Sequence, residues 1–123
     1  MSTARFDTIV PSAGGTGRNA PRGIAAAWAN LSGFSTISLR NSGNVSSVTD
    51  NGTGNYTFNL TNSMTGHYSG QVSASATADA STDNVTMGLV NRSSSSFTAD
   101  IENGSGAQSD AQQLDALIHG DLA

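Results

Sequence analysis

Apolar and polar side chains alternate strictly from residue 56 to residue 61, and this alternation constrains the fold more than any other feature of the chain. Tyr56, Phe58 and Leu60 point to one side of an extended backbone, and the polar residues between them point to the other. A period of two is typical of a strand with one buried and one solvated face. A weaker strand pattern precedes it at Val45–Val48, and Asp50–Gly54 supplies residues that tolerate positive φ. The pattern predicts a β-hairpin.

Further short segments show strand patterns and are separated by Gly, Asn and Ser turns. They are Ala25–Leu31, Ile37–Leu39, Val72–Ala78, Val85–Leu89 and Phe97–Ile101, with Thr98, Asp100 and Glu102 expected to face water. Many short strands with such turns favour an all-β fold, a small antiparallel β-sandwich. The side chains expected to pack in its core or between subunits are Trp28, Ile37, Leu39, Tyr56, Phe58, Leu60, Phe97, Ile101 and Ile118.

The last apolar segment fits two structures. Ser109 and Gln112 have the spacing of a capping box, and Leu114, Leu117 and Ile118 have helical spacing. Leu114, Ala116 and Ile118 also alternate as they would in a strand. Local rules slightly favour a short helix here.

The apolar content is low for a chain of one-domain length. Leu, Ile, Val and Phe account for 22 of the 123 residues, charged residues make up 11%, and the net charge is −4. Disorder normally requires a higher net charge than this, and the apolar residues are patterned. Because subunit contacts can bury surface that one chain cannot, we expect folding to be completed by association.

Residues 1–23 differ from the rest of the chain in charge and pattern. They hold three arginines against one aspartate, a net +2, whereas residues 24–123 hold two arginines against eight acids, a net −6. Pro11 and Pro21 block a helix, so we expect an extended N-terminal arm followed by a domain over 24–123. An acidic domain is unsuited to nucleic acid. An arm that docks on a protein surface would use Arg5, Phe6, Ile9, Val10, Arg18 and Arg22; the alternative is that its charge is incidental.

No motif indicates an enzyme, a metal or a cofactor. Gly15-x-Gly17-x-x-Ala20 matches a dinucleotide fingerprint, but Pro21 follows it where a helix would be needed. The pairs His67 and His119, Asp100 and Glu102, and Asp79 and Asp83 lack the partners or spacing of a catalytic or calcium site. The chain has no cysteine, no apolar run of membrane-spanning length and no signal peptide, so we expect a soluble protein made in the cytosol, with no membrane partner.

Three segments carry a resemblance to a known family. Asn44–Met64, Ala27–Leu31 and Ile118–Ala123 resemble the hairpin, the opening strand and the last strand of the distal knob domain of tailed-bacteriophage tail fibres and tailspikes. The likeness covers Gly23–Ala123, and the hairpin is its most specific part. It implies a β-sandwich that assembles as a homotrimer on a virion, and it favours a strand at the C-terminus.

The resemblance leaves the location on the virion open. Fibre and spike proteins carry a long shaft before the knob, whereas this sequence passes from Met1 to knob-like residues within about two dozen positions. We therefore expect a capsid cement or decoration trimer on the outer capsid surface, made in the host cytoplasm and attached to the major capsid protein through its arms. Addition of a strand to a capsid edge is one mode of such attachment. The alternative is a tail-fibre tip that recognises host surface glycans through distal loops. A glycan-cleaving enzyme is a third, less supported alternative.

Overall fold

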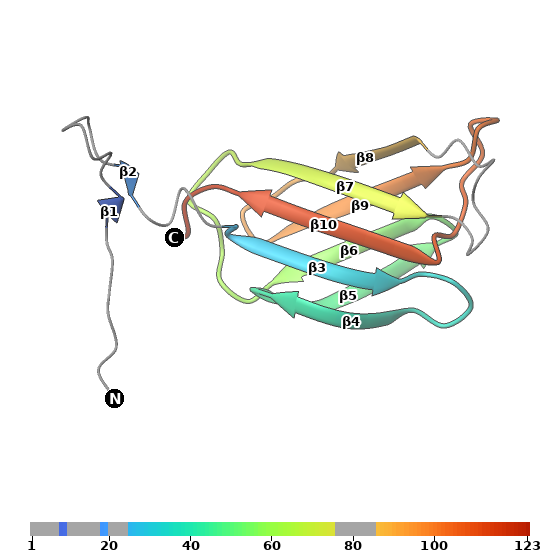
Figure 1. The fold of residues 1–123 in the computed structure, drawn as a ribbon, viewed down its shortest axis with the longest axis horizontal. Helices are drawn as coiled ribbons and strands as arrows, with labels where there is room; N and C mark the ends of the chain where they lie inside the picture. The colour runs from blue at the N-terminus through green and yellow to red at the C-terminus, as the bar shows by residue number, and fades with distance from the viewer. Residues whose placement is uncertain (1–7, 10–17, 20–24, 76–85) are drawn as a thin grey trace.

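The computed structural model describes residues 8–9, 18–19, 25–75 and 86–123, and there the chain is all-β, as predicted. Two four-stranded antiparallel sheets pack face to face (Figure 1). The strands are β3 (Ala27–Ser32), β4 (Ser38–Gly43), β5 (Val45–Gly52), β6 (Asn55–Leu60), β7 (Ser69–Ser75), β8 (Thr86–Val90), β9 (Ser96–Glu102) and β10 (Gln113–His119). Within the arm, β1 (Thr8–Ile9) and β2 (Arg18–Asn19) form a short antiparallel pair.

The first sheet has the strand order β4-β3-β10-β7, and the second sheet has the order β5-β6-β9-β8. Because every strand reverses the direction of the preceding one, the connections gather at two opposite ends (Figure 1). The start of β3, loop 61–68, loop 91–95 and the C-terminus lie at one end, here called the proximal end. Loops 33–37, 53–54 and 103–112 lie at the other, the distal end.

The predicted hairpin is confirmed as β5 and β6. Gly52 and Gly54 have φ values of +125° and +68°, and the Asp50 carboxylate accepts a hydrogen bond from the Gly52 amide at 2.9 Å. Gly54 is also enclosed, since a Cβ there would lie 2.5 Å from the Ile101 carbonyl oxygen. The turn therefore needs glycine at residue 54 both for its backbone conformation and for its packing against the backbone of Ile101 and Ser109.

The core lies between the sheets and is built around aromatic residues. The rings of Phe58 and Phe97 stack with their centroids 4.9 Å apart. Six of the residues predicted for the core are buried, namely Tyr56, Phe58, Leu60, Phe97, Ile101 and Ile118. Ile37 and Leu39 are only partly buried and pack against this cluster.

Trp28 does not belong to the core, which corrects the prediction for this residue. Ala27, Ala29 and Leu31 fill the inward positions of β3, so Trp28 points outward, with 39% of its surface exposed. A contact of Trp28 with another subunit stays a prediction. Thr98 was expected to face water, but only 4% of it is exposed, because it lies on a central strand with its hydroxyl 2.8 Å from that of Thr57.

The C-terminal segment is a strand, so the helical alternative is wrong. β10 pairs with β3 on one side and β7 on the other, and these two ladders outweigh the local capping signal. Met87 and Leu89 lie in β8 as expected. Several predicted residues fall outside the described part of the chain: Arg5, Phe6, Val10, Arg22, Ala76, Ala78 and Val85.

Candidate functional site

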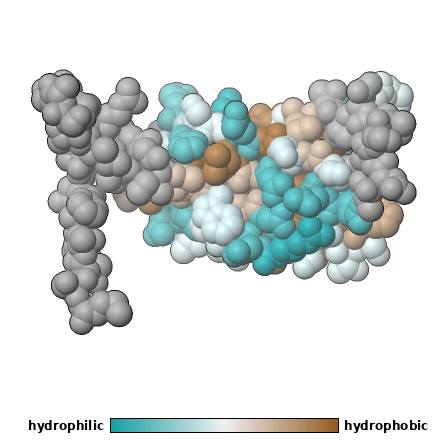
Figure 2. Space-filling view, in the orientation of Figure 1, coloured by the Kyte–Doolittle hydropathy of each residue, from teal (hydrophilic) through white to brown (hydrophobic). Residues whose placement is uncertain are grey.

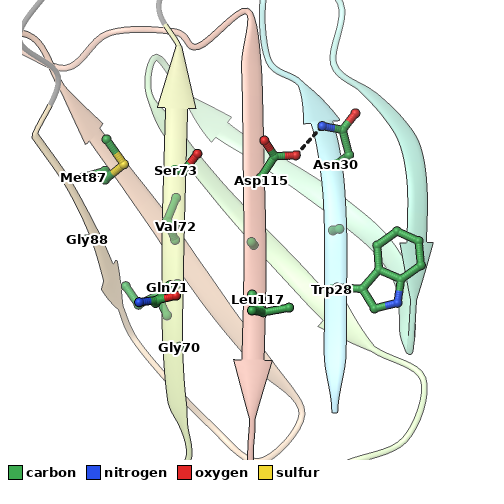
Figure 3. Close-up of a pocket in the computed structure, with 13 residues that line it drawn as sticks. Trp28, Asn30, Gly70, Gln71, Val72, Ser73, Met87, Gly88, Asp115 and Leu117 are labelled. Carbon is green, nitrogen blue, oxygen red and sulfur yellow. Dashed lines mark hydrogen bonds between the residues drawn. The ribbon is translucent and has the colours of Figure 1, made fainter. Parts of the chain in front are cut away.

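A hollow of about 840 Å³ lies against the first sheet and reaches the edge of β8. Its walls come from β3, β10, β7 and β8, which are far apart in the sequence (Figure 3). Figure 2 shows this side of the molecule, where brown apolar residues lie beside teal polar ones over the middle of the sheet. Its lining includes Trp28, Asn30, Gln71, Asp115 and Leu117.

Trp28 forms one wall of the hollow and is held in place by a glycine. It pairs with Gly43 of the edge strand β4, and a Cβ at Gly43 would lie 2.3 Å from the indole Nε1. The ring therefore rests against the backbone of β4, in a position that any other residue at 43 would block. One side of the indole is fixed on the strand, and the remaining exposed surface is available to a ligand.

A polar pair lies on the same face of the sheet, two residues along β3 from Trp28. Asn30 and Asp115 are directly opposite each other on β3 and β10, and the Asn30 amide donates a short hydrogen bond to the Asp115 carboxylate (Figure 3). Gln113 donates to the other oxygen of the same carboxylate, at 3.2 Å. The carboxylate is thus oriented by two neutral amides and retains lone pairs for a further donor.

The far wall of the hollow is apolar and depends on a close approach of β7 and β8. A Cβ at Gly70 would lie 2.2 Å from Cδ1 of Leu89 and 2.5 Å from Cδ1 of Ile118. The absence of a side chain at Gly70 lets Leu89 reach across to Ile118. Leu117 is half-buried on β10, within the hollow.

A second hollow of about 590 Å³ lies at the proximal end, between loop 61–68 and loop 91–95. It contains His67 and Arg92, and the Arg92 guanidinium donates to the carbonyl oxygen of Tyr68 at 3.3 Å. Burial raises the pKa of the Tyr68 phenol. This hollow carries positive charge on a predominantly acidic domain.

A ladder of amides and hydroxyls runs over β5, β6 and β9 on the outer face of the second sheet, beside the carboxylate of Asp100. Asn51 donates to Asn55 at 2.9 Å and to Thr57 at 2.8 Å, and Asn59 donates to Ser47 at 3.1 Å. These side chains satisfy one another across the strands. The amide–hydroxyl ladder is defined here by Ser47, Thr49, Asn51, Asn55, Thr57, Asn59 and Thr98.

Most predicted site residues are not brought together. Asp100 lies at the border of the amide–hydroxyl ladder, where its carboxylate accepts from Asn55 at 3.0 Å and from Gln108 at 2.7 Å. His67 and His119 are exposed. Among the described residues no group of three His, Cys, Asp or Glu side chains gathers around one point. Asp79, Asp83 and the Gly15–Gly17 motif lie outside the described part of the chain.

Sequence reasoning missed the hollow, although it placed Trp28 on a strand. The signal in the sequence that could have revealed the hollow is an apolar residue at a position where the alternation of a strand places a solvent-facing side chain. Trp28 lies between the inward Ala27 and Ala29, and Leu117 lies between the inward Ala116 and Ile118. Both outward apolar residues line the same hollow.

Comparison with protein families, with curated proteins and with solved structures finds no match to this chain. Across the described ranges, no helix is long and apolar enough to cross a membrane.

Proposed function

We propose that this chain is a non-enzymatic structural protein of a tailed-bacteriophage virion, a homotrimeric cement protein that decorates the outer capsid surface. The observation that carries the proposal is the separation of the two ends of the sandwich. β3 begins at the proximal end, beside the C-terminus, and three connecting loops lie at the distal end (Figure 1). A domain that is entered at one end can be anchored there and can present its opposite end to the surroundings.

The composition of residues 1–23 supports attachment through this segment. Its net charge of +2 contrasts with the net −6 of residues 24–123, and it contains the apolar side chains of Phe6, Ile9 and Val10. Opposite charge guides encounter with an acidic surface, and apolar anchors stabilise the contact once formed. Three arms in one trimer would bind multivalently to major capsid protein, so that each single contact can be weak.

The small core supports assembly. Val72, Ala74, Met87 and Leu89 belong to the interior of the sandwich by their strand positions, yet they remain only partly buried in the single chain. Apolar surface left open in this way gains stability when another subunit covers it.

A second candidate function is recognition of host surface glycans at the tip of a tail fibre. The hollow on the first sheet favours it, because its lining contains both an indole with one free side and an oriented carboxylate with its amide partners. Such a combination provides an apolar surface for a sugar ring and hydrogen-bonding groups for its hydroxyls. Polysaccharide binding by wild type and by Trp28→Ala, with the exposed proximal Leu122→Ala as control, tests this candidate.

Labelling of intact particles tests the location. We expect copies distributed over the whole capsid in a cement protein and copies confined to the tail in a fibre tip. Deletion of residues 2–22 is expected to abolish capsid binding while the sandwich stays folded. Capsid binding by the shortened chain would refute attachment through the arm.

Two arm variants separate the contributions of charge and apolar contact. One replaces Arg5, Arg18 and Arg22 with Gln, and the other replaces Phe6, Ile9 and Val10 with Ser. We expect the arginine variant to bind capsids more slowly and with less salt dependence, and the apolar variant to dissociate faster. Identical binding by both variants and wild type would show that the composition of the arm is incidental.

A further inference from the structure

The two flanks of the sandwich differ in how their edge strands are protected. β4 and β5 form the edges of one flank, and both are interrupted by register shifts. Arg40 is an extra residue in β4, and Ser46 and Asn51 are extra residues in β5. β7 and β8 form the edges of the other flank and pair with β10 and β9 without any shift. Bulges are one of the means by which sheets prevent unwanted edge pairing, and β7 and β8 lack them.

The two flanks also differ in the charged residues of their edge strands. β4 contains Arg40 and β5 contains Asp50, whereas neither β7 nor β8 contains a charged residue. Residues 24–123 carry a net −6, so two copies repel each other over most of their surfaces. The flank formed by β7 and β8, called here the neutral flank, is therefore the one whose edge strands carry no charged side chain.

The neutral flank is also where interior side chains remain open. Val72 and Ala74 of β7 and Met87 and Leu89 of β8 point inward but are only partly buried, and 37% of Val90 is exposed. The hollow described above reaches this flank through Gly70 and Gly88. Unprotected edges, absence of charge and open apolar side chains therefore coincide.

Strand direction selects one pairing of copies. β7 runs from the proximal to the distal end, and β8 runs back (Figure 1). When all copies point the same way, β7 of one copy is antiparallel to β8 of the next, whereas β7 against β7 would be parallel. A two-fold pairing of β7 with β7 would be antiparallel, but it would place the arms at opposite ends of the dimer. A β7–β8 contact is heterologous, and a rotation of one third of a turn between successive copies closes such contacts into a ring of three.

We infer that the neutral flank binds a second copy of this chain, with β7 of each subunit pairing antiparallel to β8 of the next around a three-fold axis. The inference rests on the proposed homotrimer and adds its interface. It places all three arms at one end of the assembly, where they can contact one surface together. The Trp28 side of one subunit then faces the amide–hydroxyl ladder side of its neighbour.

A charge placed on the neutral flank tests the interface. Ser73→Glu adds an anion to the exposed face of β7, directly opposite Asp115, and Ser47→Glu adds the same anion to the exposed face of β5, on the opposite flank. Light scattering after gel filtration is expected to give wild type and Ser47→Glu three times the chain mass of 12.4 kDa and Ser73→Glu a lower mass. Far-UV circular dichroism checks that the sandwich persists. A trimeric Ser73→Glu would contradict the interface.

Cross-linking gives a second measurement that does not depend on destabilisation. The chain has no cysteine, so Ser73→Cys and Gly88→Cys each introduce a single thiol, and a Cβ at Gly88 meets no atom within 4 Å. The two variants are mixed, unfolded, refolded together and treated with a short bis-maleimide. We expect a covalent dimer from the mixture and none from either variant alone. A dimer from Ser73→Cys alone would establish a two-fold contact and overturn the inference.

Other results separate this inference from the proposed function. A trimer that gives no cross-link between residues 73 and 88 overturns the interface and leaves the homotrimer standing. A monomeric wild type overturns both the interface and the trimer, whereas particle labelling decides the capsid location independently. If deletion of residues 2–22 yields a folded monomer, the arm and not the neutral flank holds the subunits together, and the inference fails.

Discussion

The Tyr56 hydroxyl allows a quantitative test of how the distal end is held together. The side chain is fully buried, and its hydroxyl lies 2.9 Å from the Asp110 carboxylate and 3.0 Å from the Gly33 carbonyl oxygen. A hydrogen bond to a charged group contributes about 1.5–3 kcal/mol. Asp110 keeps the Gly54 amide as a second donor at 2.9 Å. We therefore expect Tyr56→Phe to lower the free energy of unfolding by about 1–2 kcal/mol at pH 7.

The same substitution should behave differently in alkali. Burial raises the pKa of Tyr56 above its ordinary value of 10.0, and the hydrogen bond to Asp110 adds to the shift. The folded chain keeps this phenol protonated, whereas the unfolded chain ionises it near pH 10. The contribution of Tyr56 is therefore complete below pH 10 and falls by about 1.4 kcal/mol per pH unit above it. The wild-type and Tyr56→Phe stabilities should meet about one pH unit above 10.

Urea unfolding followed by far-UV circular dichroism between pH 7 and pH 11, at one protein concentration, measures both effects. Tyr68→Phe is the matched control, because its hydroxyl donates to the neutral Ser96 carbonyl at 3.0 Å. We expect a smaller loss at pH 7 for this control. Equal stabilities of Tyr56→Phe and wild type at pH 7, or a difference that stays constant up to pH 11, would refute the reasoning.

Substitutions at three further positions test local features. Gly43→Ala should displace the Trp28 ring from β4, because the added Cβ would lie 2.3 Å from the indole, and the fluorescence of this only tryptophan should shift to longer wavelength. Residue 54 has a positive φ and lies close to the Ile101 carbonyl oxygen. Gly54→Ala should therefore lower the free energy of unfolding, measured with urea, by about 2 kcal/mol. Asn44 has a φ of +56° and hydrogen bonds to Ala26 and Asn62, so Asn44→Gly should keep the turn but lower the thermal midpoint, and Asn44→Ala should lower it further.

The sequence best predicted the strands in which large apolar side chains face the core and polar side chains face solvent. The alternation at residues 56–60 predicted both the hairpin and its buried side chains, because the β5–β6 turn is local and its glycines are adjacent in the sequence. The same rule predicted that Phe97 and Ile101 are buried. Alternation with a period of two does not show which of the two alternating sets of side chains faces the core when the inward side chains are small. In β3 the inward set includes Ala27 and Ala29, and this explains the error at Trp28.

The hollow could not be predicted because its parts meet only through long-range pairing. Asn30 and Asp115 are 85 residues apart and become neighbours because β10 lies between β3 and β7. Local rules even favoured a helix where β10 stands. The asymmetry between the flanks is likewise a property of register, since the extra residues at Arg40, Ser46 and Asn51 are recognised only against their partner strands.

The amide–hydroxyl ladder on the second sheet has a consequence for the behaviour of the protein in different media. Its donors and acceptors are neutral at every pH between the ordinary pKa values of carboxylates and phenols, and dissolved ions screen charges but not such contacts. A broad wall of the domain should therefore keep the same hydration shell in dilute buffer and in concentrated brine. This face should stay wetted and non-adhesive in both media.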